Sequence, residues 1–358
     1  MPAPVPLPVG TASTGKGTSA PAGPEAVRSR AVTTVVLLAA LAALCAAVLL
    51  SLAVGARHIS PAVVFEALFQ GGGGEDGEVV RDLRVPRTVI GLLVGAALAL
   101  AGTVLQGLTR NPIADPSILG ISQGASAGVV LAIAFAGVHT ILGYVWFALI
   151  GAALATVAVY AVAHSSRGGA SPVKLALAGA AISALLASVT MGVLTTRVAT
   201  LDEFRFWQVG GIAGRDAEVI HRIWPFLLLG AVLAVSVARG LDALALGEDM
   251  AKGLGRNVAA VRIVGGIGAT LLAGAAVAVA GPLAFIGLAV PHMARRLVGS
   301  SHGRVMLLGA LMGPVMLLAS DVVGRIVFPP GEIPAGVMTA LIGVPFLVVL
   351  VRRKEVPA

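Results

Sequence analysis

The 358-residue sequence has few charged residues, few aromatic residues and a single cysteine. Charged residues make up only 12% of the chain, whereas a typical soluble domain carries about a quarter. So few charges cannot cover a water-facing surface, and the mean hydropathy of +0.97 predicts that lipid surrounds most of the protein. The lone Cys45 excludes an intrachain disulfide, and its place in the first apolar run predicts a buried, inert thiol.

Groups that bind metals or carry enzymatic chemistry are also scarce. The six histidines form no i, i+4 pair and no Cys/His cluster, so neither a metal site nor a cofactor bound by this chain is predicted. Gly10–Gly17 nearly fits a phosphate-binding loop, but a glycine stands where Ser or Thr should follow Lys16. Gly120–Gly124 fits the G-x-S-x-G pattern of hydrolases, yet it lies where a membrane helix begins. The net charge of +8 follows membrane topology, so nucleic acid is not an expected partner.

Apolar runs of about 20 residues, the length that crosses a bilayer, recur along the chain. The predicted fold class is therefore all-α, a polytopic membrane protein of about ten transmembrane helices. Residues 1–30 are expected to be a disordered cytoplasmic tail, 31–352 the transmembrane domain and 353–358 a cytoplasmic C-terminal tail. The expected spans are 31–55, 86–108, 116–137, 141–163, 174–196, 223–240, 262–281, 284–298, 304–326 and 334–351.

The distribution of charge predicts the orientation. Ten spans put both termini on one side, and Arg28 and Arg30 before the first span place that side in the cytoplasm. On this topology sixteen of the 25 Lys and Arg residues lie inside, while acidic residues gather outside. Charges deep in the spans are nearly absent, which weighs against an ion-coupled transporter. Asp321 is expected to pair with Arg325 on the same helix face.

An internal repeat supports this topology. Residues 92–102 return as residues 271–281, with eight of eleven positions identical at an offset of 179. The offset also aligns Pro112 with Pro291, and it aligns Gly120 and Gly124 with later glycines. Five spans separate the copies, so they enter the membrane from opposite sides as an inverted repeat. Small residues allow close helix packing, and the glycines expected to serve it are Gly95, Gly102, Gly120, Gly124, Gly128, Gly274 and Gly281.

The longest inner loop, about residues 240–261, has a pattern of its own. It predicts two short helices broken at Gly247, with Glu248 and Asp249 at the second N-terminus, where carboxylates suit the helix dipole. A loop helix with an apolar face could fill a partner's groove. An ordinary amphipathic linker fits the pattern equally well.

Several motifs together resemble the FecCD family, the membrane subunits of type II ABC importers that include the cobalamin permease. The resemblance covers roughly residues 31–352. Its motifs are Arg84-Val85-Pro86-Arg87, Gly95 to Gly102, Asn111 to Pro116, Leu119 to Ser122, Ala245-Leu246-Gly247-Glu248, Phe285 to Leu288 with Pro291-His292, and Glu332 to Gly336 with Thr339-Ala340 and Gly343.

The resemblance implies a ten-helix, cobalamin-permease-like fold and a set of partners. These are a second permease subunit in a homodimer, two cytoplasmic ATPase subunits that bind ATP and Mg, and an extracytoplasmic substrate-binding protein. It implies that Arg84, Arg87 and Arg325 meet carboxylates of the binding protein. The implied ATPase-coupling residues are Ala245, Leu246, Gly247, Glu248, Asp249, Ala251, Gly253, Leu254 and Gly255, and the implied gate or pathway residues are Ser171, Pro172, Glu332, Pro334, Gly336 and Thr339.

The function that follows is transport, not catalysis. The expected protein lies in the cytoplasmic membrane and moves cargo inward by alternating access, along a path lined by spans 174–196 and 334–351. Iron–siderophore complexes are the favoured cargo, with cobalamin or haem as alternatives. An ion-coupled secondary transporter is the alternative from another class.

Overall fold

The computed structural model describes residues 24–55, 59–165, 172–329 and 331–352, and within these ranges it contains helices and no strands. The predicted all-α class is confirmed. Ten helices match the expected spans: α1 (Pro24–Ala53), α4 (Val85–Thr109), α5 (Ile121–Ala136), α6 (Ile141–His164), α7 (Pro172–Thr196), α9 (Ala217–Ser236), α12 (Val258–Ala280), α13 (Ile286–Val298), α14 (His302–Val327) and α15 (Ala335–Arg352). Short helices join them: α2 (Pro61–Phe69), α3 (Gly74–Glu78), η1 (Val79–Arg84), η2 (Pro116–Leu119), α8 (Val198–Gln208), α10 (Ala238–Ala245) and α11 (Glu248–Gly253).

Helix length separates the described spans into two groups. Seven helices are long and apolar enough to cross a bilayer, whereas α5 and α15 are shorter apolar helices and α13 has only 13 residues. Shorter helices are tolerated at membrane depth where neighbouring protein covers them.

Three expectations about boundaries and burial are corrected. Helix α1 begins at Pro24, inside the range expected to be a disordered tail. The sixth span was placed too late, because α9 ends at Ser236 and the separate helix α10 follows. Cys45 is exposed, because α1 runs along the edge of the bundle with most of its surface uncovered.

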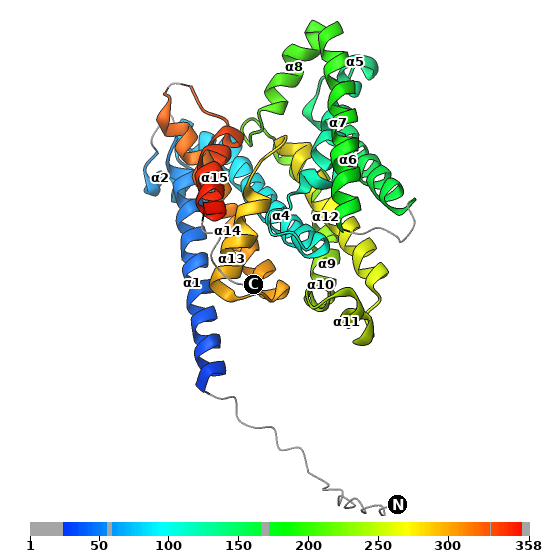
Figure 1. Cartoon of the computed structure of the whole chain (residues 1–358). Helices are drawn as coiled ribbons and strands as arrows, with labels where there is room; N and C mark the ends of the chain where they lie inside the picture. The colour runs from blue at the N-terminus through cyan, green and yellow to red at the C-terminus, as the bar shows by residue number, and fades with distance from the viewer. Residues whose placement is uncertain (1–23, 56–58, 166–171, 330, 353–358) are drawn as a thin grey trace, which may run out of the picture.

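Helices α4, α12 and α14 form the centre of the bundle. Their apolar windows are 78%, 72% and 61% buried, against 17–33% for the other four long spans. In Figure 1, α5 to α8 lie on one side of α4 and α12, and α1, α13, α14 and α15 lie on the other. Below, the end of the bundle that the charge count predicts to face outward, where Arg87 lies, is called the outer end. The opposite end, which carries α11, is called the inner end.

The inverted repeat is confirmed by the directions of α4 and α12. Gly265, near the start of α12, packs against Leu108 near the end of α4. At the opposite ends, the amide of Gly211 donates to the carbonyl oxygen of Ala280, and Gly211 shares a cavity with Arg87 at the start of α4. The two copies therefore run antiparallel through the centre of the protein.

The expected ungapped register beyond the two copies does not hold. Helix α4 continues past Gly102 to Thr109, whereas α12 ends immediately before the equivalent Gly281. As a result, Pro112 lies in the connection after α4 while Pro291 lies inside α13. The offset of 179 therefore aligns the paired helices only as far as these two glycines.

The next helix of each repeat begins with the same backbone turn. Gly120 precedes α5 with φ +72°, and Phe285 precedes α13 with φ +70°. Glycine adopts this left-handed conformation freely, whereas a bulky residue pays for it in strain. The Phe285 ring lies directly against Gly343 of α15, where any side chain would collide with it.

Candidate functional site

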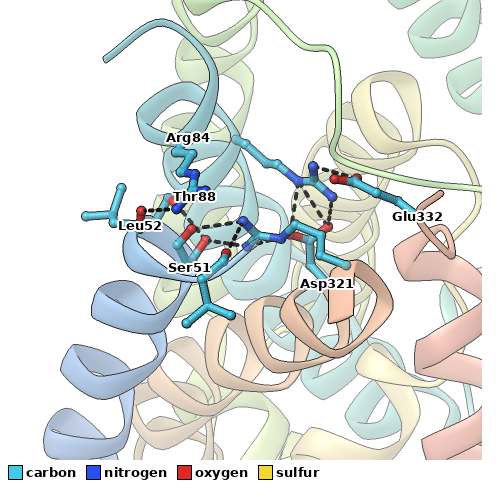
Figure 2. A network of polar contacts seen from close by, with 9 residues as sticks. Ser51, Leu52, Arg84, Thr88, Asp321 and Glu332 are labelled. Atoms are coloured by element: carbon cyan, nitrogen blue, oxygen red, sulfur yellow. Dashed lines mark hydrogen bonds and ion pairs between the residues drawn. The ribbon is translucent and has the colours of Figure 1, made fainter. Parts of the chain in front are cut away.

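A network of ion pairs occupies the outer end, around Arg87 at the start of α4 (Figure 2). The Arg87 Nη2 lies 2.8 Å from Asp321 Oδ1, and its Nε lies 3.0 and 3.2 Å from the two Asp321 carboxylate oxygens. Its Nη1 lies 2.8 Å from Glu332 Oε2, just before α15. The expected pair between Asp321 and Arg325 is confirmed at 3.1 Å. Because Asp321 is 2% exposed and Glu332 34%, the network runs from the protein interior to its outer surface.

Two further arginines hold the outer end of α1 (Figure 2). Arg325 Nη1 donates to the carbonyl oxygens of Ser51 (3.0 Å) and Val54 (2.9 Å), and Arg84 Nη1 donates to that of Leu52 (2.7 Å). The last carbonyls of a helix have no partner within it, and cations there also interact favourably with the helix dipole. The arginines therefore join α1 to α4 and α14.

This arrangement restricts what the three arginines can offer a partner. Arg84 and Arg325 are only 6% and 3% exposed, so their guanidinium groups are directed into the protein. The Arg87 side chain is 14% exposed, and both of its carboxylate partners lie within the chain. A docking protein would therefore meet a surface that these arginines hold in place, with Arg87 nearest to it.

A cavity of about 780 Å³ opens beside this network at the outer end. The segment that joins α8 to α9 forms one wall, and the residues before α15 form another. Three aromatic rings, Tyr144, Phe206 and Trp207, contribute to the lining together with charged side chains. The cavity therefore combines apolar surface with groups that can hydrogen-bond.

The expected gate residues divide between the two ends of the bundle. Pro172 begins α7 at the inner end, and Ser171 lies outside the described residues. At the outer end, Glu332 and Pro334 line the cavity, and Gly336 donates its amide to the carbonyl oxygen of Gly210. Thr339 is fully buried, and its hydroxyl donates to the Gly336 carbonyl oxygen. The structure therefore does not bring these residues into one constriction.

At the inner end, the predicted pair of short helices is present. Helix α10 ends at Ala245 and α11 begins at Glu248, with Gly247 at φ +118° between them. Glu248 pairs with Lys252 (3.3 Å) and with Arg262 of α12 (2.9 Å). These partners hold the pKa of the Glu248 carboxyl below its ordinary value, the hydrogen bond from Lys252 first and the charge of Arg262 second. The residues from Ala245 to Gly255, called the coupling segment below, are thus fixed to the bundle.

The coupling segment exposes three large apolar side chains that its residue pattern alone did not single out. Leu246, Met250 and Leu254 recur every fourth residue and are 65%, 59% and 60% exposed, whereas Ala251 is fully buried. Met250 and Leu254 lie one turn apart on α11 and its C-terminal cap, whereas Leu246 precedes the break at Gly247 and caps α10. The inner end therefore presents an exposed apolar surface formed by both short helices, called the apolar stripe below.

Most of the selected glycines lie at close approaches between helices. A Cβ on Gly95 would stand 2.6 Å from the α14 backbone, and a Cβ on Gly102, Gly124, Gly128 or Gly281 would collide with a carbonyl oxygen of a neighbouring segment. Two positions are less crowded. Gly120 and Gly274 would bring a Cβ only to 3.6 and 3.4 Å from another side chain.

A buried amide that sequence reasoning missed joins α4 to α13. Gln106 is 4% exposed, and its Nε2 lies within 3.3 Å of the carbonyl oxygens of Ala114, Gly287 and Leu288. Its Oε1 accepts a hydrogen bond from Arg295. The available signal was a lone amide in an otherwise apolar span. Among the described residues, no three His, Cys, Asp or Glu side chains converge as metal ligands.

Comparison with known proteins gives consistent results. The profile of the FecCD transport family matches residues 41–353. The iron(3+)-hydroxamate import permease FhuB of Bacillus subtilis is 40% identical over 90% of this chain and 84% of its own length. The ferric enterobactin permease FepD of Escherichia coli is 41% identical over 85% of this chain and 91% of its own. A solved metal-chelate type ABC transporter in an inward-facing conformation has a TM-score of 0.77 and 29% identity, covering 90% of this chain and 99% of that one.

These similarities, together with seven helices able to cross a bilayer, define a multi-pass membrane permease of the ABC importer class. The chain belongs to the FecCD transport family.

Proposed function

We propose that this chain is the membrane subunit of an importer for iron–siderophore complexes, and that it moves cargo inward by alternating access. Relatives with 40% and 41% identity carry names for hydroxamate and enterobactin import, which favours siderophores over cobalamin or haem. Residues 31–352 form the transporting domain, with both termini in the cytoplasm. A homodimer would place the exposed faces of α7 and α15 along the central path.

Energy and cargo come from partners in this proposal. The chain itself binds no cofactor, and two cytoplasmic ATPase subunits bind ATP and Mg. An extracytoplasmic binding protein docks over the outer end, where Arg87 lies nearest the surface and Arg84 and Arg325 lie beneath it. An induced fit that exposes these two buried arginines would allow them to pair with carboxylates of the binding protein.

The observation that carries the proposal is the apolar stripe of the coupling segment. Leu246, Met250 and Leu254 are exposed at the inner end, beyond the apolar part of the spans. An exposed apolar surface on short helices of this kind is one that a partner's groove can cover.

The proposal is tested by co-purification with candidate ABC ATPase subunits. Met250→Asp places a charge in the centre of the stripe and should abolish ATPase binding. Val198→Asp makes the same change at an exposed residue of α8 and should leave binding intact. Reversing the charge of Glu248 is a less informative change, because it would place an arginine beside Lys252 and Arg262 and disturb the segment itself.

The outcomes separate the two classes of transporter. If folded Met250→Asp loses the ATPase and Val198→Asp keeps it, the importer proposal is supported. If the folded wild-type chain binds no ATPase in any lipid or detergent, the importer proposal fails. Uptake that survives without an ATPase but stops with an ionophore would then establish an ion-coupled transporter.

A further inference from the structure

Helices α10 and α11, called the coupling helices below, make a second polar contact with the bundle, and this contact is to α14. Asp242 lies in the last turn of α10, three residues before the coupling segment begins at Ala245. Its Oδ1 lies 2.7 Å from both the backbone nitrogen and the ring Nδ1 of His302, and the hydroxyl of Ser301 lies 3.4 Å from its Oδ2. Ser301 makes no capping hydrogen bond of its own to α14. Asp242 therefore supplies, from another helix, the carboxylate that favours a helix N-terminus.

The His302 ring is enclosed at this point. The side chain is 9% exposed, and a Cβ on Gly107 would stand 2.7 Å from its Nε2. The ring thus occupies the space between Asp242 of α10, the first turn of α14 and the last turns of α4. A displacement of α10 cannot leave His302 in place without breaking its contact with Asp242.

The contact between Asp242 and His302 is called the joint below. From it, α4 and α14 run to the outer end packed against each other. A Cβ on Gly91 would meet the Leu318 side chain, and one on Gly95 would stand 2.6 Å from the Pro314 backbone. Close-packed helices transmit displacement because their interiors compress little. At the outer end, the pair is fastened again by Arg87 and Asp321.

Within the part of the chain that the structure describes, two ion pairs attach the coupling helices to the bundle. Glu248 of α11 pairs with Arg262 of α12, and Asp242 of α10 pairs with His302 of α14. Of these two, only the pair of Asp242 and His302 reaches the start of α14, the helix whose opposite end carries Asp321 and Arg325 of the outer ion-pair network. Between α10 and α11 lie only Leu246 and Gly247, whose amides donate to carbonyl oxygens of α10 at 3.1 Å.

We propose that Asp242 and His302 are positioning residues that transmit movement of the coupling segment to the α4–α14 pair, and through it to the outer cavity. This inference rests on the proposed importer function. The joint acts as a contact that must remain closed while the segment moves. Losing it frees the ATPase to turn over without moving the outer end.

The test uses the complete importer in proteoliposomes, with its ATPase and binding protein. Three quantities are measured: the amount of bound ATPase, the ferric chelate imported per ATP hydrolysed, and the ATP-dependent thiol labelling of Ala213→Cys in a Cys45→Ala background. Ala213 is an exposed residue that lines the outer cavity. Its labelling therefore reports movement at the far end of the pair.

Asp242→Ala and His302→Leu should keep the ATPase bound. Chelate imported per ATP should fall roughly tenfold, the scale of one lost hydrogen bond to a charged group, because ATP hydrolysis no longer moves the α4–α14 pair. Labelling at residue 213 should no longer depend on ATP. His302→Asn offers an amide N–H near the position of Nδ1 and should retain coupling. Asp216→Ala and His221→Leu, at exposed positions near the start of α9, are matched controls that should behave as the wild type.

The possible failures are distinguishable. If the folded Asp242→Ala and His302→Leu complexes import as much chelate per ATP as the wild type, the joint does not transmit movement. Should Asp242→Ala fail to fold, equal coupling in His302→Asn and His302→Leu would overturn the proposal as well. If wild-type complexes do not form or import no chelate, the proposed function itself fails.

Discussion

Asp321 provides the sharpest test of how the outer end is held together. Asp321→Asn retains the size of the side chain but removes the charge that faces both Arg87 and Arg325. Arg325 is 3% exposed, so its guanidinium would remain buried without a carboxylate of its own, while Arg87 would keep Glu332. Removing one partner of a buried ion pair typically destabilises a protein by about 3–5 kcal/mol, and we expect a loss in this range.

The assay is unfolding in mixed micelles by titration with denaturing detergent, followed by helical circular dichroism. Asp202→Asn is the matched control, because Asp202 forms an exposed pair with Arg205 at 3.3 Å, with both side chains nearly 60% exposed. Such surface pairs contribute about 0–1 kcal/mol. Adding Arg325→Met to Asp321→Asn should restore part of the stability by removing the orphaned charge. Equal losses for Asp321→Asn and Asp202→Asn would refute the argument.

Of three further predictions, two use the same unfolding titration and one uses the protection of α11 amides against hydrogen exchange. Gly95→Ala would move α4 roughly 1 Å away from α14 and should lower the free energy of unfolding by about 1–3 kcal/mol. Gly303→Ala, on α14 with open space around it, should not lower it. Equal unfolding midpoints for the two variants would contradict the packing argument. Gln106→Leu removes a buried donor that serves carbonyl oxygens of α13 and should cost about 1–3 kcal/mol, so an unchanged midpoint would be evidence against its role. Because Lys252 and Arg262 hold the pKa of the Glu248 carboxyl below its ordinary value, the protection of α11 against hydrogen exchange should be complete at neutral pH and decline as the pH falls through the lowered pKa. Glu248→Gln should remove that dependence, and a decline that persists in this variant would assign it to other groups.

The order of the spans, the inverted repeat and the break at Gly247 could be predicted because each leaves a local pattern. Hydropathy marks a span, a fixed offset marks a repeat, and glycine between two short amphipathic runs marks a break. The pair between Asp321 and Arg325 belongs to the same class, because four residues along a helix bring side chains together.

Contacts between distant parts of the chain could not be predicted in this way. Charge counting placed Arg84 and Arg325 at the outer end, but it cannot tell whether a guanidinium faces water or the carbonyls of α1. Likewise, the pairing of Asp242 with His302 spans 60 residues and depends on how α10 folds beneath α14. The register error after Gly102 has a related cause, since alanine-rich sequence continues smoothly although one helix ends and the other goes on.

The matching turns before α5 and α13 bear on whether the two halves of the chain could still be exchanged. Gly120 makes its turn without a side chain, whereas Phe285 makes the same turn with a ring that fills the space above Gly343. Phe285 and Gly343 both lie in the second half, so the ring and the glycine that receives it would move together if that half were exchanged. A copy of the first half in its place would keep the turn but would not bring the ring. The two halves therefore share one backbone turn and have diverged in the side chain that the turn carries.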